Sequence, residues 1–178
     1  MKKILMTLAA AFVAVTMSAQ IYVGGGIGFS SSKYRGGDNQ TAYKILPEIG
    51  YNIDETLAVG VQLGYQQGYV MSYNAVDKEK TLTISPYLRY NALKFDKLTV
   101  FGDLNVLYEN EDYDGAKSTT IGVGIKPGIA IALNDKFTFV SHLGFLGYKQ
   151  EKEDDVDASS AIGFSASNGV GFALYYNF

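Results

Sequence analysis

Ionisable side chains recur at alternate positions of strand-length segments whose other positions are apolar. Acids and bases that share an interior could form an ion path, a catalytic group or a static network. Isolated buried ions are costly, so such groups must pair with one another. We therefore expect the acids Glu48 and Asp103 to pair with the bases Arg89 and Lys126. The full polar network that we predict comprises Lys44, Glu48, Arg89, Asp103, Lys126 and His142.

The sole histidine, His142, lies in the middle of its segment on the same face as the other network residues. A histidine can serve as a general base or as a metal ligand, but hydrolytic chemistry needs a serine or an aspartate arranged with it. The connections between segments show no such constellation. We expect His142 to be a hydrogen-bonded filler, and we expect neither catalysis nor a cofactor; a gated ion path through rearranged pairs remains the alternative to a static plug.

Two connections are strongly acidic, and one of them partly matches a calcium-binding loop. Asn110, Asp112, Asp114 and Gly115 fit the opening of an EF-hand, but Ile121 stands where the bidentate glutamate is required, so we predict no metal site there. Weak divalent-cation binding that bridges to lipopolysaccharide remains open. A contact surface for an extracellular partner is also open, at Tyr69, Met71 and Tyr73.

Eight segments alternate between apolar residues and small or polar ones, the pattern of β-strands with two unlike faces. No segment shows a helical period. The apolar faces comprise Ile21 to Phe29, Tyr43 to Tyr51, Leu57 to Tyr65, Leu82 to Tyr90, Leu98 to Tyr108, Ile121 to Ile131, Phe137 to Phe145, and the closing set Val170, Phe172, Leu174, Tyr176 and Phe178. The pattern predicts an all-β, eight-stranded antiparallel up-and-down transmembrane β-barrel, with the polar network inside.

The connections alternate in length. Residues 52–55, 91–97 and 134–136 are short, whereas residues 31–41, 67–80, 109–117 and 150–166 are long and polar. In bacterial barrels the short turns face the periplasm and the long loops face outside. We therefore expect both termini in the periplasm and four extracellular loops. A soluble ligand-binding barrel, our third alternative, has no reason for this asymmetry.

Residues 1–19 combine Lys2 and Lys3, an apolar run and a small-residue end, as a secretory signal peptide does. We predict its cleavage, which leaves residues 20–178 as one barrel domain. Loss of these two lysines reduces the 15 basic residues to 13 against 18 acidic ones, a formal charge of about −5. This charge argues against nucleic acid as a partner. No further stretch is long and apolar enough for a membrane-spanning helix.

Aromatic residues collect near both ends of the apolar faces, as in the girdles at the two lipid–water interfaces of membrane barrels. Near the long connections we place Phe29, Tyr43, Tyr65, Tyr108 and Phe145, and near the short turns Tyr51, Tyr90, Phe137, Tyr176 and Phe178. Proline recurs at Pro47, Pro86 and Pro127, at a similar distance before each short turn. Because proline donates no ladder hydrogen bond, we expect a bulge at each.

Four stretches, Pro47–Gly60, Ser85–Tyr90, Phe101–Asp103 and Lys126–Ala130, resemble the small outer-membrane β-barrel-domain proteins of the Bacteroidetes, relatives of the OmpA/OmpX-like barrels. The aromatic closing strand that ends on Phe178 also resembles the signal read by the barrel-insertion machinery. The resemblance implies residence in the cell outer membrane, in contact with its lipid and lipopolysaccharide. We expect a polar-plugged lumen and a structural or surface-interaction role through the loops; the alternative is a small-solute or ion pore.

Overall fold

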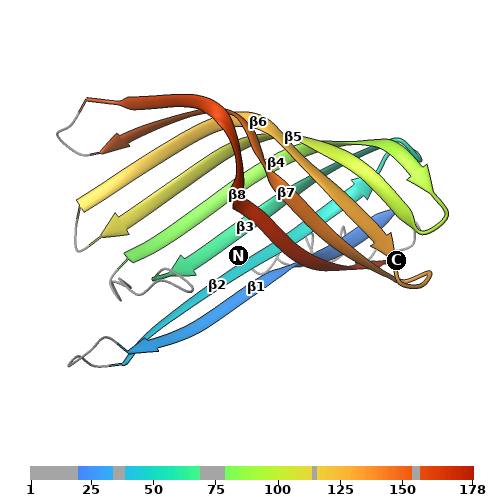
Figure 1. The fold of residues 1–178 in the computed structure, drawn as a ribbon, viewed down its shortest axis with the longest axis horizontal. Helices are drawn as coiled ribbons and strands as arrows, with labels where there is room; N and C mark the ends of the chain where they lie inside the picture. Colours follow the sequence, from blue (N-terminus) through green and yellow to red (C-terminus); the bar gives the residue numbers. More distant parts are fainter. Residues whose placement is uncertain (1–19, 34–38, 69–78, 114–115, 154–156) are drawn as a thin grey trace, which may run out of the picture.

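The computed structural model describes residues 20–33, 39–68, 79–113, 116–153 and 157–178. The predicted signal peptide lies outside these residues, as do Tyr69, Met71, Tyr73 and Asp114. Each strand pairs antiparallel with the next, and the last pairs with the first, which confirms the predicted closed eight-stranded barrel (Figure 1). The strands are β1 (Ile21–Lys33), β2 (Asn39–Asn52), β3 (Leu57–Gln67), β4 (Glu79–Phe95), β5 (Leu98–Tyr113), β6 (Ala116–Ala132), β7 (Phe137–Glu153) and β8 (Ser159–Asn177).

The two faces of the barrel wall differ as the alternation requires. On β4, Leu82, Ile84 and Leu88 are exposed on the outside, whereas Ser85 and Arg89, one register step away, are buried inside. A strand turns successive side chains to opposite faces, so each strand supplies one apolar row and one polar row. The outer surface therefore presents hydrocarbon, and the lumen collects the polar residues. None of the described residues forms a helix long and apolar enough to cross a membrane.

Strands extend further toward the long connections than the sequence indicated. β5 runs to Tyr113 and β6 begins at Ala116, so most of the predicted loop 109–117 is strand. The predicted loop 150–166 is likewise largely β7 and β8, which reach Glu153 and begin at Ser159. A tilted strand needs only about 9–11 residues to span a bilayer. β4 to β8, with 16 to 19 residues each, are longer than that.

The short turns at the opposite end are held by side chains that cap their own backbone. Asp54 Oδ1 accepts hydrogen bonds from the N–H groups of Thr56 and Leu57, at 2.6 and 2.8 Å. In the turn between β6 and β7, Asn134 Oδ1 accepts from Lys136 and Phe137, both at 2.9 Å. Asparagine and aspartate favour such turns for this reason. Lys136 Nζ also donates to Tyr176 Oη at 3.0 Å, and this hydrogen bond raises the pKa of Lys136.

The prolines do not behave as predicted at two of their three positions. At Pro47 and Pro86 the ladder on one side is interrupted, but the flanking residues keep their register, so the expected bulges are wrong there. A missing N–H removes hydrogen bonds without requiring an extra residue. Beside Pro127 the register does shift, and the extra residue lies on the partner strand β7.

That shift on β7 centres on Gly144, whose φ of 126° lies in a region open mainly to glycine. Ile125 pairs with Leu146 and Gly128 pairs with His142, so three steps along β6 correspond to four steps along β7. β7 therefore contains one additional residue at this point. Such a bulge reverses which face the following residues occupy. Phe145 therefore points into the lumen, and its predicted place in the outer aromatic girdle is wrong.

Candidate functional site: the barrel lumen

The centre of the lumen is an arginine held by two acids. Arg89, on β4, is 6% exposed and donates through Nε and Nη2 to the two carboxylate oxygens of Asp103 at 2.7 and 2.8 Å. The two residues are direct cross-strand partners on β4 and β5. Glu48 reaches the same guanidinium from β2, with Oε1 3.6 Å from Nη2. Paired, bidentate geometry of this kind is what makes a buried arginine tolerable.

Aromatic rings surround this ion group. Tyr87 Oη and Tyr175 Oη both donate to Glu48 Oε1, at 2.6 and 2.5 Å, and the hydroxyls of Tyr22 and Tyr87 lie 2.7 Å apart. Arg89 Cζ lies 4.0 Å from the ring centroid of Phe101 and within 5.7 Å of the three tyrosine rings. The rings thus satisfy the carboxylate by hydrogen bonds and the guanidinium by cation–π contact.

Sequence reasoning gave these four aromatic residues no role. Their alternation with the outward apolar rows already implies an inward orientation, and that was the available signal. The alternation does not predict that the rings from β1, β4, β5 and β8 meet at the same height along the barrel axis, because that height depends on the stagger between strands. We name the layer formed by Tyr22, Glu48, Tyr87, Arg89, Phe101, Asp103, Val140 and Tyr175 the plug.

His142 joins the edge of the plug. Its Nε2 lies 2.9 Å from Asp103 Oδ2, and its ring stands edge-on to Phe101 with centroids 5.4 Å apart. Asp103 therefore bridges the histidine and Arg89. Across the described ranges, no group of three or more acidic or histidine side chains is arranged to hold a metal ion.

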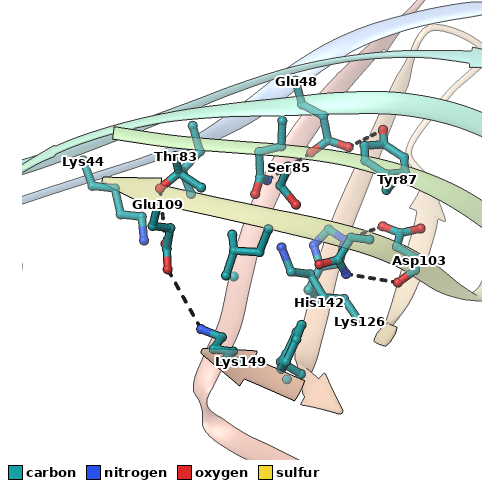
Figure 2. A pocket seen from close by; sticks show the side chains of 17 residues that line it. Lys44, Glu48, Thr83, Ser85, Tyr87, Asp103, Glu109, Lys126, His142 and Lys149 are labelled. Carbon is teal, nitrogen blue, oxygen red and sulfur yellow. Dashed lines mark hydrogen bonds and ion pairs between the residues drawn. The ribbon is translucent and has the colours of Figure 1, made fainter. Parts of the chain in front are cut away.

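The two lysines of the predicted network lie apart from the ion group. Lys126 is the register partner of Asp103 on β6, yet no carboxylate among the described residues forms an ion pair with its ammonium group. The expectation that Lys126 pairs directly with Asp103 or Glu48 is therefore wrong. Its side chain, like that of Lys44, lines a cavity instead (Figure 2).

This outer cavity of about 210 Å³ lies on the long-connection side of the plug, and a second hollow lies on the short-turn side. They share no lining residue. Four strands contribute inward residues to both hollows, and on each of them one inward residue lies between the part that lines the outer cavity and the part that lines the second hollow. These four residues, which form a closed layer, are Gly50 on β2, Arg89 on β4, Phe101 on β5 and Val140 on β7. Phe101 and Val140 are 2% and 0% exposed, so the layer separates the two hollows.

The girdle residues other than Phe145 lie on the outer face or at strand ends. Tyr43 and Tyr65 have ring centroids 5.8 Å apart near the long connections. At the short-turn end, Tyr176 contacts both Phe137 and Phe178 edge-on, and Tyr51 Oη donates to Gln20. Phe29, Tyr90 and Tyr108 are exposed outward. In the closing strand, Phe172 and Leu174 face outward, and the backbone of Val170 pairs with Leu143.

A closed antiparallel barrel with an apolar outside and a polar inside is the form in which a sheet crosses a bilayer, because closure pairs most backbone groups within the sheet. The chain belongs to the family of outer membrane protein β-barrel domains, which it matches over residues 4–168. The resemblance seen in the sequence is thereby confirmed at the level of the family, and the protein is an outer-membrane β-barrel.

Two solved structures are similar to the barrel. The crystal structure of Neisserial surface protein A matches with a TM-score of 0.53 and 18% identity, over 90% of this chain and 98% of that chain. A major outer membrane protein from Thermus thermophilus matches with a TM-score of 0.44 and 13% identity, over 89% and 98%. The first likeness shows a shared fold. No curated protein sequence matches the chain.

Proposed function

We propose that the protein is a plugged, non-conducting barrel that serves a structural or surface-interaction role through its long connections, rather than an enzyme or a pore. The observation that carries the proposal is the plug. Water-filled passage needs a continuous polar path, whereas this layer holds an arginine, two acids and four aromatic rings in mutual contact. Opening it would leave buried charges without partners, which is costly.

The proposed orientation places the short turns, with the start of β1 and the end of β8, in the periplasm. The long connections then face outside. Support comes from residues 68–78, which separate β3 from β4, and from the 16 to 19 residues of β4 to β8, which exceed what a bilayer needs; the turn between β4 and β5, at the other end, comprises only Asp96 and Lys97. In this orientation the exposed acids Glu151 and Glu153 on β7 lie at the cell surface.

The proposed partners follow from the surfaces. Outer-membrane lipid covers the apolar outer face, lipopolysaccharide meets the strand ends beside the long connections, and the insertion machinery recognises the closing strand during assembly. An extracellular partner would bind at the connections. The acidic strand ends favour contact with cationic groups on such a partner, or divalent ions shared with lipopolysaccharide.

Single-channel recording of refolded residues 20–178 in a planar bilayer tests the proposal. Folded, inserted protein, verified by its heat-modifiable electrophoretic migration, should give no conductance steps. The matched control is a Phe101→Ala, Tyr175→Ala double variant, which removes two rings of the plug and should conduct. Steady, reproducible steps from the unaltered protein would contradict the proposal and favour a small-solute or ion pore, in which the plug is a gate.

A further inference from the structure

The barrel wall is incompletely paired where its first and last strands meet. The ladder between β1 and β8 comprises four residue pairs and ends at Gly25–Leu174, whereas β1 pairs with β2 along its whole length. Beyond this point the described residues of β1 and β8 form no ladder with each other, and the strands diverge toward the long connections (Figure 1). At Gly26 the backbones still touch, because an added Cβ there would lie 2.7 Å from the Phe172 carbonyl oxygen; we call the opening beyond it, between residues 27–33 and 159–171, the seam.

The outward side chains along the seam are the most exposed apolar groups of the described barrel. Ile27 and Ile162 are 89% and 85% exposed, because neither has a neighbouring strand on the seam side. The next three in exposure also lie on these two strands: Phe29, Phe172 and Phe164. In an outer-membrane protein these side chains face lipid, so the seam is continuous with the hydrocarbon of the bilayer.

The inner side of the seam is lined by glycine and opens into the outer cavity. β1 turns Gly26 and Gly28 inward, and β8 turns Gly171 inward, where it forms part of the cavity wall. A Cβ added at Gly171 would meet no atom within 4 Å. Among the side chains that the structure describes, none therefore closes the cavity from the seam at this position. A molecule in the bilayer could place part of itself in the cavity without crossing the plug.

The cavity and the ion group beside it carry one net positive charge. Lys149 Nζ lies 4.0 Å from Glu109, and Glu48 and Asp103 share the single guanidinium of Arg89, so three lysines and one arginine face three carboxylates. Lys44 and Lys126 line the same cavity, and among the described residues neither has an ion-pair partner (Figure 2). Lys44 is also the register partner of Gly28, so it stands beside the seam.

One buried acceptor in the cavity wall also lacks a donor. Asn105 is 1% exposed and donates through Nδ2 to the Asp103 carbonyl at 3.2 Å, while its Oδ1 has no partner among the described residues. This oxygen is itself closed off from the cavity by packed atoms, so it places no requirement on an occupant. The unpaired strand edges of the seam do place one, because they carry backbone groups that hydrocarbon alone cannot satisfy and that a polar head group can.

We infer that the outer cavity and the seam together bind a single-chain anionic amphiphile from the membrane. Its acyl chain lies on the outer face against Ile27 and Phe172, and its anionic head group passes through the seam into the cavity, against Lys44 and Lys126. A phosphate or a carboxylate head group supplies the required charge. The plug stays closed throughout, so this binding is independent of conduction.

Native mass spectrometry of refolded residues 20–178 in a non-ionic detergent tests the inference with defined probes. The probes are 1-palmitoyl lysophosphatidate, palmitate, neutral 1-palmitoylglycerol and zwitterionic 1-palmitoyl lysophosphatidylcholine, which share one acyl chain. We expect one bound molecule per chain, with lysophosphatidate, palmitate or both binding at least about tenfold more tightly than the other two, as expected for loss of charge-assisted hydrogen bonds. Which anion binds more tightly distinguishes a lysophospholipid from a fatty acid as the source.

Three variants locate the site. Lys126→Met should weaken anion binding by about tenfold. Gly171→Leu should abolish it by filling the cavity beside the seam. Lys94→Met, which alters an exposed lysine in the short-turn half, should leave it unchanged. Heat-modifiable migration verifies folding, and the probe comparison on the unaltered protein remains decisive if a variant fails to fold.

The inference is overturned if neither anionic probe binds, or if the neutral glyceride binds as tightly as the tighter-binding of the two anionic probes. It is also overturned if folded Lys126→Met and Gly171→Leu bind like the unaltered protein. A protein dimer that excludes every probe would overturn it too, because the seam edges would then be paired with those of a second copy.

Discussion

The half of the barrel near the short turns and the half near the long connections are filled in different ways. In the first, Tyr22 and Tyr175 stack across the β1–β8 junction with centroids 5.1 Å apart, and the strands there are paired. In the second, β1 turns Gly26 and Gly28 toward the lumen, a cavity replaces the rings, and the strands separate. Large inward side chains and closure of the wall thus occur together.

The difference indicates that the half near the short turns stabilises the barrel and that the half near the long connections is the one suited to binding. The plug satisfies its own polar groups, so it can act as a rigid closure. The outer cavity leaves Lys44 and Lys126 without an ion-pair partner among the described residues, so it is suited to a ligand. Substitutions in the two halves should therefore differ in kind: the first should lower the free energy of unfolding, and the second should alter binding.

The largest expected effect is that of Arg89→Ala. Removing the guanidinium leaves Asp103 and Glu48 buried without their cation, which should lower the free energy of unfolding by about 3–5 kcal/mol. Urea unfolding in lipid vesicles, followed by tyrosine fluorescence, measures it. Lys44→Ala, in the outer cavity, is the control and should have a much smaller effect. An unchanged midpoint for Arg89→Ala would show that the plug is hydrated.

A matched pair of glycine substitutions compares packing at the plug with packing at the inner side of the seam. An added Cβ at Gly50 would overlap the ring of Tyr22, whereas one at Gly171 meets open space. Gly50→Ala should therefore lower the free energy of unfolding by about 1–3 kcal/mol, and Gly171→Ala should leave it nearly unchanged. The same unfolding experiment applies. Equal effects would mean that the outer cavity is as tightly packed as the plug.

The smallest effect should come from an ion pair outside both interiors. Lys94 Nζ and Glu55 Oε2 lie 3.6 Å apart on the short-turn surface, with side chains 61% and 89% exposed. Water and salt screen such a pair, so Lys94→Ala should change the free energy of unfolding by at most about 1 kcal/mol. A loss approaching that of Arg89→Ala would contradict the assignment of stability to the plug.

The fold could be predicted from sequence because eight segments with alternating apolar residues can cross a membrane only as the strands of a closed barrel. The positions at which the strands end could not be predicted. Beyond the bilayer both faces of a strand meet water, so the apolar row stops while the ladder continues, as at Glu109 to Tyr113 on β5. The reversal at Gly144 was also hidden, because a single glycine among 20 carries no mark of a bulge.

The membership of the polar network was predicted more fully than its pairing. Alternation places Arg89, Asp103 and Lys126 inside, but contacts across the lumen depend on the stagger of distant strands. Glu48 on β2 meets Tyr175 on β8 through a 2.5 Å hydrogen bond, a contact between residues far apart in sequence. Lys126, although it is the register partner of Asp103, forms no ion pair with it and lines the cavity instead.

The most direct test of the account is whether the two hollows communicate. The sequence has no cysteine, so a Thr83→Cys, Thr99→Cys double variant carries one thiol in the outer cavity and one on the short-turn side of the plug. Inserted into sealed liposomes and treated outside with a small, charged thiol reagent, each chain should gain one adduct by mass spectrometry, whatever its orientation. Permeabilising the liposomes should then allow the second. Two adducts per chain on sealed liposomes would show a continuous lumen and contradict the plugged barrel.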